Sequence, residues 1–388
     1  MNFGIAYGIV LVIFLIFGFF CSNPLRKRYL LLSAFFIAIP AFFVKPAPFS
    51  TWDTIRFSNL LDIIRSLNSS GVFNGLQWGM SESVYANQPI VVIYIWLLSF
   101  FSNNGIFFYV TIVLFVFLLA LLVVKSLEKY KVTNNMVGVI TQLIVLMIFN
   151  LFFEVEGVRN FLAFDIFALA FFVDVNTLNK KYKFLCWMAY LIAYAFHPAV
   201  IPFIIFRIIL LSKNRWIIFF TKLGALIYTF FTPVILSFFN SISFISPLIE
   251  RADNYFYGQS NYDAHATNRE ILFTTLILVY LIIELLLFYL IRMSKQINQI
   301  YLQMYIIVLL FTIGSFLNMQ VYLRSIILLL FMSVPIKVKL FSNISELNYN
   351  VVYKSSVYFY RYASIIFSIM MFGYWYIQTY SRVPSLSF

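Results

Sequence analysis

The chain has 388 residues, of which 63% are hydrophobic and only 11% are charged, with a formal net charge of +13. Several stretches stay apolar for about 15 to 22 residues, close to the ~20 that a helix needs to cross a bilayer, and they lack the alternation of a membrane β-barrel. This composition predicts an all-α, polytopic transmembrane helical bundle that forms a single domain over residues 1–388. Its basic residues are spread over separate loops, which argues against a nucleic-acid partner.

The apolar stretches predict about twelve spans with the N-terminus outside. They cover residues 3–21, 29–44, 105–124, 136–152, 160–177, 184–197, 198–211, 217–239, 271–291, 301–317, 321–336 and 357–378. The stretch 89–101 is too short to span comfortably, and counting it as a span would put the basic loop 125–131 outside. We therefore expect a re-entrant or interfacial helix there.

Charged residues sort by side in this arrangement. Most lysines and arginines fall in short inner loops, which include 26–28, 125–131, 180–183, 213–215, 292–295 and 337–339. Because basic loops resist translocation, this side is the cytoplasmic one. Nearly every residue capable of chemistry then lies on the outer face, mainly near the outer loops 45–88 and 241–270.

Arg159 lies in the segment EVEGVRN (154–160), at the outer end of a short predicted helix. A cation in the apolar zone costs ~2.5–3.5 kcal/mol, so it usually has a partner or a function. The planar fork of its guanidinium suits a phosphate or a carboxylate, which predicts an anion clamp. The alternative is a structural ion pair with Glu154 or Glu156, and the two interpretations are compatible because a carboxylate can orient the guanidinium.

His197 is the only histidine within an apolar stretch, and Pro198 follows it. The imidazole is suited to act as a base or to donate a hydrogen bond to a sugar or diphosphate. The alternative is a structural role in which His197 caps the preceding helix and Pro198 occupies the first turn of the next.

The remaining candidates carry weaker signals. Arg324 lies one turn inside a late span, and Arg251 and Arg269 flank an outer loop that contains Tyr255. Cations beside aromatic faces suit a sugar phosphate. Asp53 is a lone carboxylate in the first outer loop, where such a residue is more often solvated surface.

Motifs for nucleotides, metals and acyl transfer are absent from the sequence. It has no Walker loop, no dinucleotide-binding glycine pattern, no nucleophile elbow and no His/Cys spacing typical of a metal site. We expect no cofactor and no metal, and an enzyme built this way takes an activated substrate from the membrane itself. Asp165 and Glu284, within spans, are expected to make bonds between helices.

Three segments resemble the EpsG family of Wzy-like polysaccharide polymerases. They are GVRNFLAFDIF (157–167), which is similar to the family's Gly-Ile/Val-Arg element, AYAFHPAVIPF (193–203), which resembles its His-Pro hairpin, and YLRSIILLLFMSVP (322–335), which resembles its late arginine-bearing helix. Their order, spacing and sidedness agree over residues 20–340. Asp53 fits an outer-loop aspartate of the family, although a tyrosine common four positions later is Phe57 here.

The resemblance implies a glycosyltransferase similar to the GT-C type, in the bacterial plasma (inner) membrane, with its active site facing outside. Its activity would be polymerisation of O-antigen, capsule or exopolysaccharide. The growing chain is transferred from undecaprenyl diphosphate onto the next lipid-linked repeat unit. The implied partners are the undecaprenyl-diphosphate-linked glycan, membrane lipid, a flippase and a chain-length regulator.

The chemistry of such a transfer matches the candidate residues. Cleavage of the anomeric C–O bond leaves a lipid diphosphate whose charge must be stabilised. The candidates for binding the diphosphate and sugar are Arg159, Arg324, Arg251, Arg269 and Tyr255. The acceptor hydroxyl needs a base or an orienting acceptor, for which the candidates are His197, Asp53 and Glu156.

Other functions remain open. A polyprenyl-phosphate-dependent transferase of single sugars would have the same sidedness. A flippase or transporter of lipid-linked oligosaccharide needs cations along both halves of its path, whereas the inner half of the predicted spans is nearly free of charge. A membrane acyltransferase would need a histidine on the inner side, which the sequence lacks.

Overall fold

The computed structural model describes residues 3–44, 53–149, 157–240, 268–291, 293–342 and 351–382. Every regular element in these ranges is a helix, so the all-α class expected from the composition is confirmed. The chain divides into two compact units, one formed by Met1–Val200 with Val334–Phe388 and the other by Ile201–Ser333.

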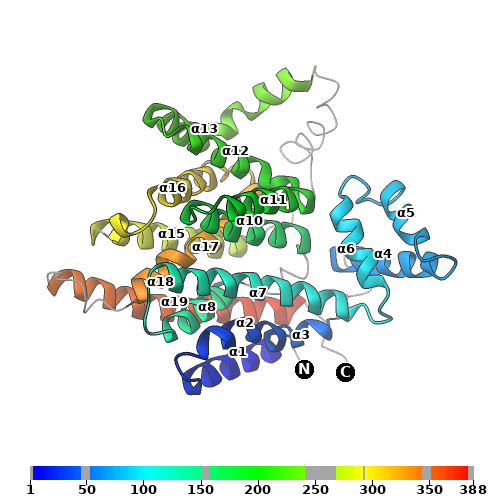
Figure 1. The fold of residues 1–388 in the computed structure, drawn as a ribbon, viewed down its shortest axis with the longest axis horizontal. Helices are drawn as coiled ribbons and strands as arrows, with labels where there is room; N and C mark the ends of the chain where they lie inside the picture. The colour runs from blue at the N-terminus through cyan, green and yellow to red at the C-terminus, as the bar shows by residue number, and fades with distance from the viewer. Residues whose placement is uncertain are drawn as a thin grey trace. The chain divides into compact units, whose positions relative to one another are not determined.

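The first unit is built around α7. Its elements are α1 (Phe3–Phe20), α2 (Arg26–Ile37), α3 (Ile39–Phe42), α4 (Asp53–Asn68), α5 (Asn74–Ser81), α6 (Pro89–Ser99), α7 (Gly105–Lys129), α8 (Met136–Ile148), α10 (Val158–Asn176), α11 (Lys180–Phe196), the 3-10 helix η1 (Pro198–Val200), α18 (Val334–Phe341) and α19 (Val351–Arg382). Helix α7 packs between α2 and α10 and also contacts α3, α8 and α18 (Figure 1). Because neighbours cover it on several sides, α7 is apolar around most of its circumference.

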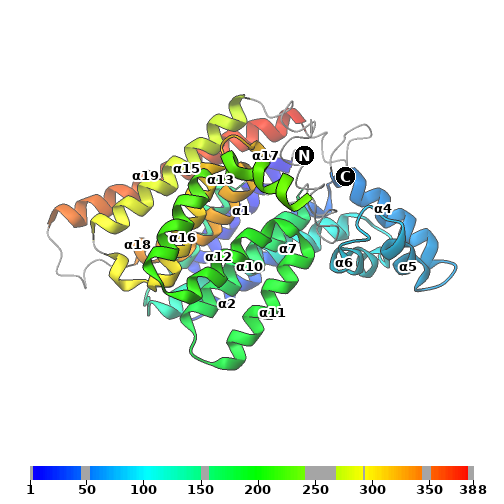
Figure 2. The same ribbon diagram turned by 90° about the horizontal axis from the view of Figure 1, so that it is seen from above.

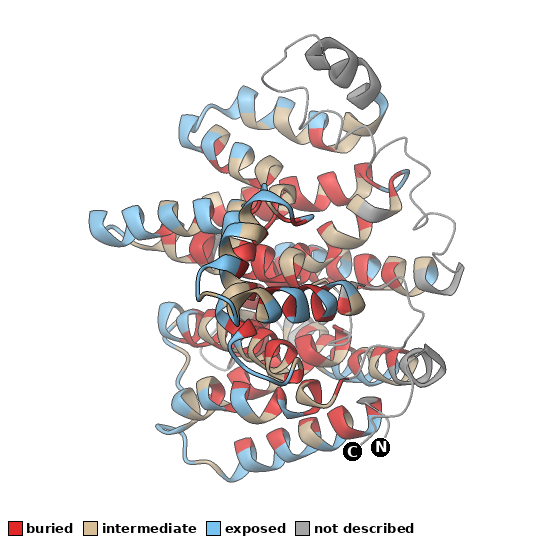
Figure 3. Ribbon diagram, turned by 90° about the vertical axis from the view of Figure 1, so that its right-hand side faces the viewer, coloured by how far each residue is buried: buried red, intermediate tan, exposed pale blue. Residues whose placement is uncertain are grey.

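The second unit contains the remaining described helices. They are α12 (Ile201–Ile209), η2 (Leu210–Ser212), α13 (Arg215–Asn240), α15 (Asn268–Leu290), η3 (Met293–Gln296), α16 (Gln299–Gly314) and α17 (Met319–Met332). Helices α13 and α16 cross closely at Gly314, whose carbonyl oxygen accepts a hydrogen bond of 2.7 Å from the hydroxyl of Thr229. The ring of Tyr228 stacks on Phe311 with centroids 4.5 Å apart. In both units the buried residues lie on the helix faces that meet other helices (Figure 3).

Two of the described helices are long and apolar enough to cross a membrane, Gly105–Lys129 and Ile271–Leu290. A third is added if α17 and α18, which follow each other at a bend, form one broken span. Several other predicted spans are shorter apolar helices here, including Met136–Ile148 and Gln299–Gly314. Helix α10 has 19 residues but carries charge, including two buried aspartates. Of the expected re-entrant stretch 89–101, residues Pro89–Ser99 form a helix of 11 residues, which at 1.5 Å per residue extends only about 16 Å.

The stretch 45–88, expected as an outer loop, contains two helices in its described part, α4 and α5. Helix α4 buries Phe57, Leu61 and Ile64, which recur at helical spacing, and it packs against α5 and α6 (Figures 1 and 2). Its mixture of apolar and charged residues is typical of an amphipathic helix rather than a span. Long apolar stretches in the sequence therefore do not indicate α4.

Arg65 fastens α4 to the chain that follows α6. Its Nε donates to the carbonyl oxygens of Ser99 at 3.2 Å and Phe101 at 3.1 Å, and its Nη2 donates to Oδ1 of Asn104 at 2.7 Å. Its Nη1 pairs with the carboxylate of Asp62 at 2.6 Å. The cation thus lies at the C-terminal end of α6, where it complements the helix dipole.

Two of the basic loops expected on the inner side meet at one end of the first unit. The side chain of Asn23, in the loop after α1, donates to the carbonyl oxygen of Thr133, in the loop after α7, at 2.7 Å. The Lys27 ammonium lies 3.7 Å from the carboxylate of Glu128. Helix α18, with two lysines, packs against α7 and α8. We call these loops together with α18 the basic end.

Helix α10 runs from the opposite end of the unit to the basic end. Phe172, near its C-terminus, lies 6.5 Å from the ring of Tyr130, which directly follows α7. Over 19 residues the helix rises about 28 Å, so its first turn lies far from the basic end. Two charged residues are buried near the basic end, Asp174, which accepts a hydrogen bond of 3.1 Å from the hydroxyl of Tyr190, and Lys337.

Candidate functional site

Arg159 lies in the first turn of α10, and segments far away in the sequence hold its side chain. Its Nη1 donates a hydrogen bond of 2.9 Å to Oε1 of Gln88. Its Cζ lies 4.4 Å from the centroid of the Tyr85 ring. A guanidinium over an aromatic face gains ~0.5–2 kcal/mol, depending on how far it is desolvated. Both of these partners are neutral groups.

Two helices begin at Arg159, and the first two turns of α4 and the first turn of α7 lie one and two ring contacts further away. Gln88 is the N-cap of α6, and Arg159 itself belongs to the first turn of α10. Phe57, in the second turn of α4, lies 5.2 Å from the ring of Phe107, in the first turn of α7. The N-terminus of a helix carries partial positive charge, so it favours an anion. Added to the charge of Arg159, this convergence makes the region suited to a phosphate or diphosphate.

A continuous row of aromatic rings extends from Arg159 to the end of α11. Tyr85 stacks on Phe57 at 5.6 Å, and Phe57 contacts Phe107. Tyr94 then lies 5.5 Å from Phe107 and 6.1 Å from Phe196. We call Tyr85, Phe57, Phe107, Tyr94 and Phe196 the aromatic row. Its packing gives the neighbourhood of Arg159 a stiff, water-poor wall and connects it to the residue after Phe196.

That residue is His197, which ends α11 and is 5% exposed. Its Nδ1 accepts a hydrogen bond of 3.1 Å from the backbone N–H of Ala199, so the ring shapes the turn into η1. The structural role considered from the sequence is therefore present. An Nδ1 that accepts leaves the proton of a neutral imidazole on Nε2. This geometry places Nε2 to donate a hydrogen bond.

Asp53 is the first residue of α4. The structure describes its backbone position but not its side chain. It lies one turn before Phe57, which contacts Tyr85, and so it belongs to the same neighbourhood as Arg159. The first unit thus brings together the start of α4, Arg159 and His197.

The other predicted site residues belong to the second unit or lie outside the described residues. Arg324 lies in α17 and Arg269 in the first turn of α15, both in the second unit, and the side chain of Arg269 is not described. Glu156, Arg251 and Tyr255 lie outside the described residues, as does Glu154.

Tyr85 and Gln88 were not predicted from the sequence. Gln88 lies 71 positions from Arg159, and no local pattern indicates that the two residues meet. The only signal is Gln88 directly before Pro89 at the start of an apolar stretch, an arrangement typical of a helix start.

Asp165 differs from its expectation. It is fully buried in α10, yet neither carboxyl oxygen makes a hydrogen bond with the described part of the chain. The predicted bond between helices is therefore absent from that part. Glu284 is fully buried in α15.

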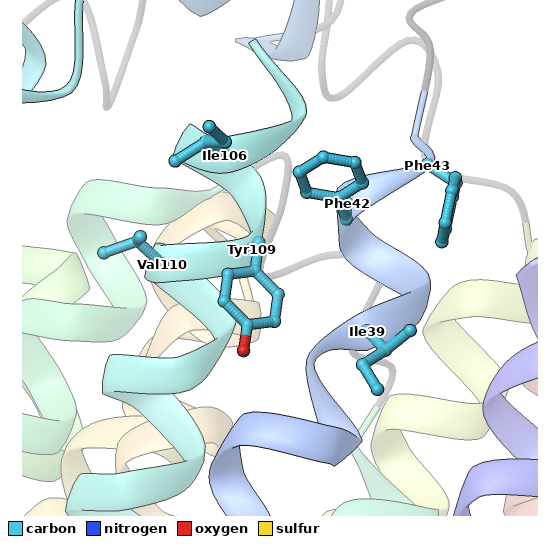
Figure 4. A pocket seen from close by; sticks show the side chains of 6 residues that line it. All are labelled: Ile39, Phe42, Phe43, Ile106, Tyr109 and Val110. Carbon is cyan, nitrogen blue, oxygen red and sulfur yellow. The ribbon is translucent and has the colours of Figure 1, made fainter. Parts of the chain in front are cut away.

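A groove between α3 and the start of α7 is apolar throughout. It is lined by Ile39, Phe42, Phe43, Ile106, Tyr109 and Val110 (Figure 4). The hydroxyl of Tyr109 donates to the carbonyl oxygen of Phe35 at 3.1 Å, so the phenol is engaged within the protein. The lining suits hydrocarbon and not a sugar. Within the described ranges, no group of three His, Cys, Asp or Glu side chains is placed to hold a metal ion.

Comparisons of the chain with protein-family models, with curated proteins and with solved structures find no match.

Proposed function

We propose that this protein is a glycosyltransferase that polymerises undecaprenyl-diphosphate-linked oligosaccharide repeat units for O-antigen, capsule or exopolysaccharide. The observation that carries the proposal is the position of Arg159. The guanidinium lies over an aromatic face where α6 and α10 begin, which is an arrangement suited to a diphosphate. The resemblance of residues 157–167, 193–203 and 322–335 to the EpsG family supports the same assignment.

The proposed setting is the bacterial plasma membrane, with about twelve spans arranged as in the GT-C type and the Arg159 end outside. The gathering of the basic loops at one end of the first unit supports this orientation, because such loops stay in the cytoplasm. Arg159 lies in the first turn of α10, which runs toward that end, so Arg159 lies at the opposite end of the unit. A lipid-linked donor in the outer leaflet would meet it there.

The reaction transfers the growing chain from its lipid onto the next unit. An acceptor hydroxyl attacks the anomeric carbon of the donor, the bond from that carbon to the diphosphate oxygen breaks, and undecaprenyl diphosphate leaves with the electron pair. Arg159 and the helix N-termini stabilise the charge that develops on the leaving group. The proton of the acceptor hydroxyl passes to a carboxylate, for which Asp53 and Glu156 are the candidates. His197 donates a hydrogen bond to the sugar or diphosphate through Nε2.

A flippase of lipid-linked oligosaccharide is the second candidate. The buried Asp174 and Lys337 near the basic end favour it, because a path through the membrane needs polar groups in both halves. The two functions differ in their product. A polymerase makes long chains on the lipid, and a flippase moves single units without extending them.

Removal of the Arg159 cation tests the proposal. Arg159→Ala in cells that depend on this protein should abolish the ladder of long polymer on a gel and leave single capped units. Arg28→Ala is the matched control, because Arg28 is exposed at the basic end and should not affect the ladder. Normal ladder length in Arg159→Ala would remove Arg159 from the mechanism. Loss of even the single capped units would favour the flippase.

The orientation has a separate test. Cysteines placed at Gly157 and Leu178, at the two ends of α10, should react with a membrane-impermeant thiol reagent from outside and inside respectively, in a chain with Cys21 and Cys186 replaced. Leu178 is 94% exposed, so its reactivity reports the side and not burial. The opposite pattern would overturn the topology.

A further inference from the structure

We propose that Gln88 and Tyr85 are positioning residues that fix the orientation of the Arg159 guanidinium for a diphosphate through contacts that carry no charge. This inference rests on the function proposed above and adds two residues to its binding site. Gln88 contacts one edge of the guanidinium and Tyr85 covers a face of it.

Both contacts come from one tight turn. The backbone N–H of Gln88 donates to the carbonyl oxygen of Tyr85 at 2.7 Å, and Pro89 follows as the first residue of α6. The turn therefore holds the Tyr85 ring and the Gln88 side-chain amide at a fixed spacing beside Arg159. Because the side chain of Gln88 makes no cap bond to its own helix, its amide oxygen is available to the arginine.

The turn is fastened on both sides. The N–H of Tyr85 donates to Oγ of Ser83 at 3.2 Å, and that hydroxyl donates to the carbonyl oxygen of Gly79, in α5, at 2.6 Å. The Tyr85 ring stacks on Phe57 of α4. Tyr85 and Gln88 are 3% and 9% exposed, so neither side chain has the freedom of a surface residue.

Both contacts to Arg159 are made by neutral groups, which is why we assign Gln88 and Tyr85 a positioning role. An amide oxygen fixes the direction of a guanidinium but carries no charge, whereas a carboxylate in its place would compete with an incoming anion. An aromatic face attracts the cation and also leaves its charge unchanged. A fork held in this way is set for the two oxygens of a phosphate group.

The test measures retention of radiolabelled undecaprenyl diphosphate by the purified full-length protein in nanodiscs, with undecaprenyl phosphate as the comparison lipid. Gln88→Glu keeps the hydrogen bond to Arg159 but adds a charge, and should weaken binding of the diphosphate at least about tenfold, more than that of the monophosphate. Gln77→Glu is the matched control, since Gln77 is exposed in the neighbouring helix α5, and should leave binding within about twofold.

Tyr85 has its own pair of variants. Tyr85→Leu removes the ring and should weaken binding about tenfold, whereas Tyr85→Phe keeps the aromatic face and should bind within about twofold of the wild type. Thermal unfolding of each variant identifies any that fail to fold. Because Gln88→Glu and Tyr85→Phe are conservative in shape, they remain informative even if Tyr85→Leu does not fold.

The outcomes separate this inference from the function on which it rests. A wild type that extends polymer in cells, with Gln88→Glu and Tyr85→Leu binding the diphosphate normally, would overturn the positioning roles and leave the polymerase standing. A wild type that neither extends polymer nor retains the lipid diphosphate would overturn the proposed function itself.

Discussion

The two ends of the first unit hold their cations in different ways. At the basic end, Lys27 and Lys125 share Glu128 in ion pairs whose side chains are between 35% and 48% exposed. At the opposite end, Arg159 contacts a buried amide and a buried ring. Exposed ion pairs contribute little to stability. Basic loop residues determine the side of the membrane through their charge, and this role does not require a fixed side-chain position. A cation held in a packed wall is fixed in position, which is what binding and catalysis require.

The largest expected difference between the ends concerns two glycines. A β-carbon at Gly105 would collide with the backbone carbonyl of Phe42, whereas the atoms nearest to one at Gly138 are side-chain methyl groups of Leu127, Leu30 and Val123. Because backbone yields less than side-chain tips, Gly105→Ala should cost about 3 kcal/mol or more, and Gly138→Ala about 1–2 kcal/mol. Thermal unfolding in detergent or nanodiscs measures both, and equal costs would contradict the close crossing of α3 and α7.

A smaller effect is expected from loss of the Arg65 fastening. Arg65→Ala removes its hydrogen bonds to Ser99, Phe101 and Asn104 and should destabilise the α4–α6 region by about 2–3 kcal/mol. Hydrogen exchange should speed up in α4, α5 and α6 while α8 stays protected. Unchanged exchange in α4 would mean that Arg65 does not fasten this region.

The smallest effect belongs to the basic end. Glu128→Gln removes both ion pairs and should change the stability by no more than about 0.5 kcal/mol, because the charges are exposed and screened by salt. Thermal unfolding at low and high salt checks this value. A cost above about 2 kcal/mol would show that the two ends are held in the same way.

Parts of this arrangement follow from the sequence, and the reasons are physical. Long apolar stretches indicate helices without any knowledge of their partners, so the all-α class and the helix 105–129 could be predicted. Helix α4 was missed because its apolar residues form a stripe between charges. Arg159 and His197 could be predicted as candidate site residues because a polar side chain within an apolar stretch costs free energy in the membrane and therefore usually has a function.

The partners of Arg159 could not be found in this way. Tyr85 and Gln88 lie more than 70 positions before it and in a loop of ordinary composition, so only the packing of α4, α6, α7 and α10 brings them together. The acceptor role of the His197 Nδ1 was equally hidden, because it depends on the path of the backbone through Ala199. The sequence therefore indicates Arg159 and His197 as candidates, and their contacts are seen only in the structure.

The central claim is that Arg159 binds the diphosphate of a polyprenol-linked glycan. The most direct measurement is the affinity of the purified protein in nanodiscs for undecaprenyl diphosphate, compared among the wild type, Arg159→Ala and Arg28→Ala. We expect a loss of about a hundredfold in Arg159→Ala, since one charge-assisted, bidentate contact contributes about 2–3 kcal/mol, and no loss in Arg28→Ala. Equal affinities of all three proteins would contradict the account.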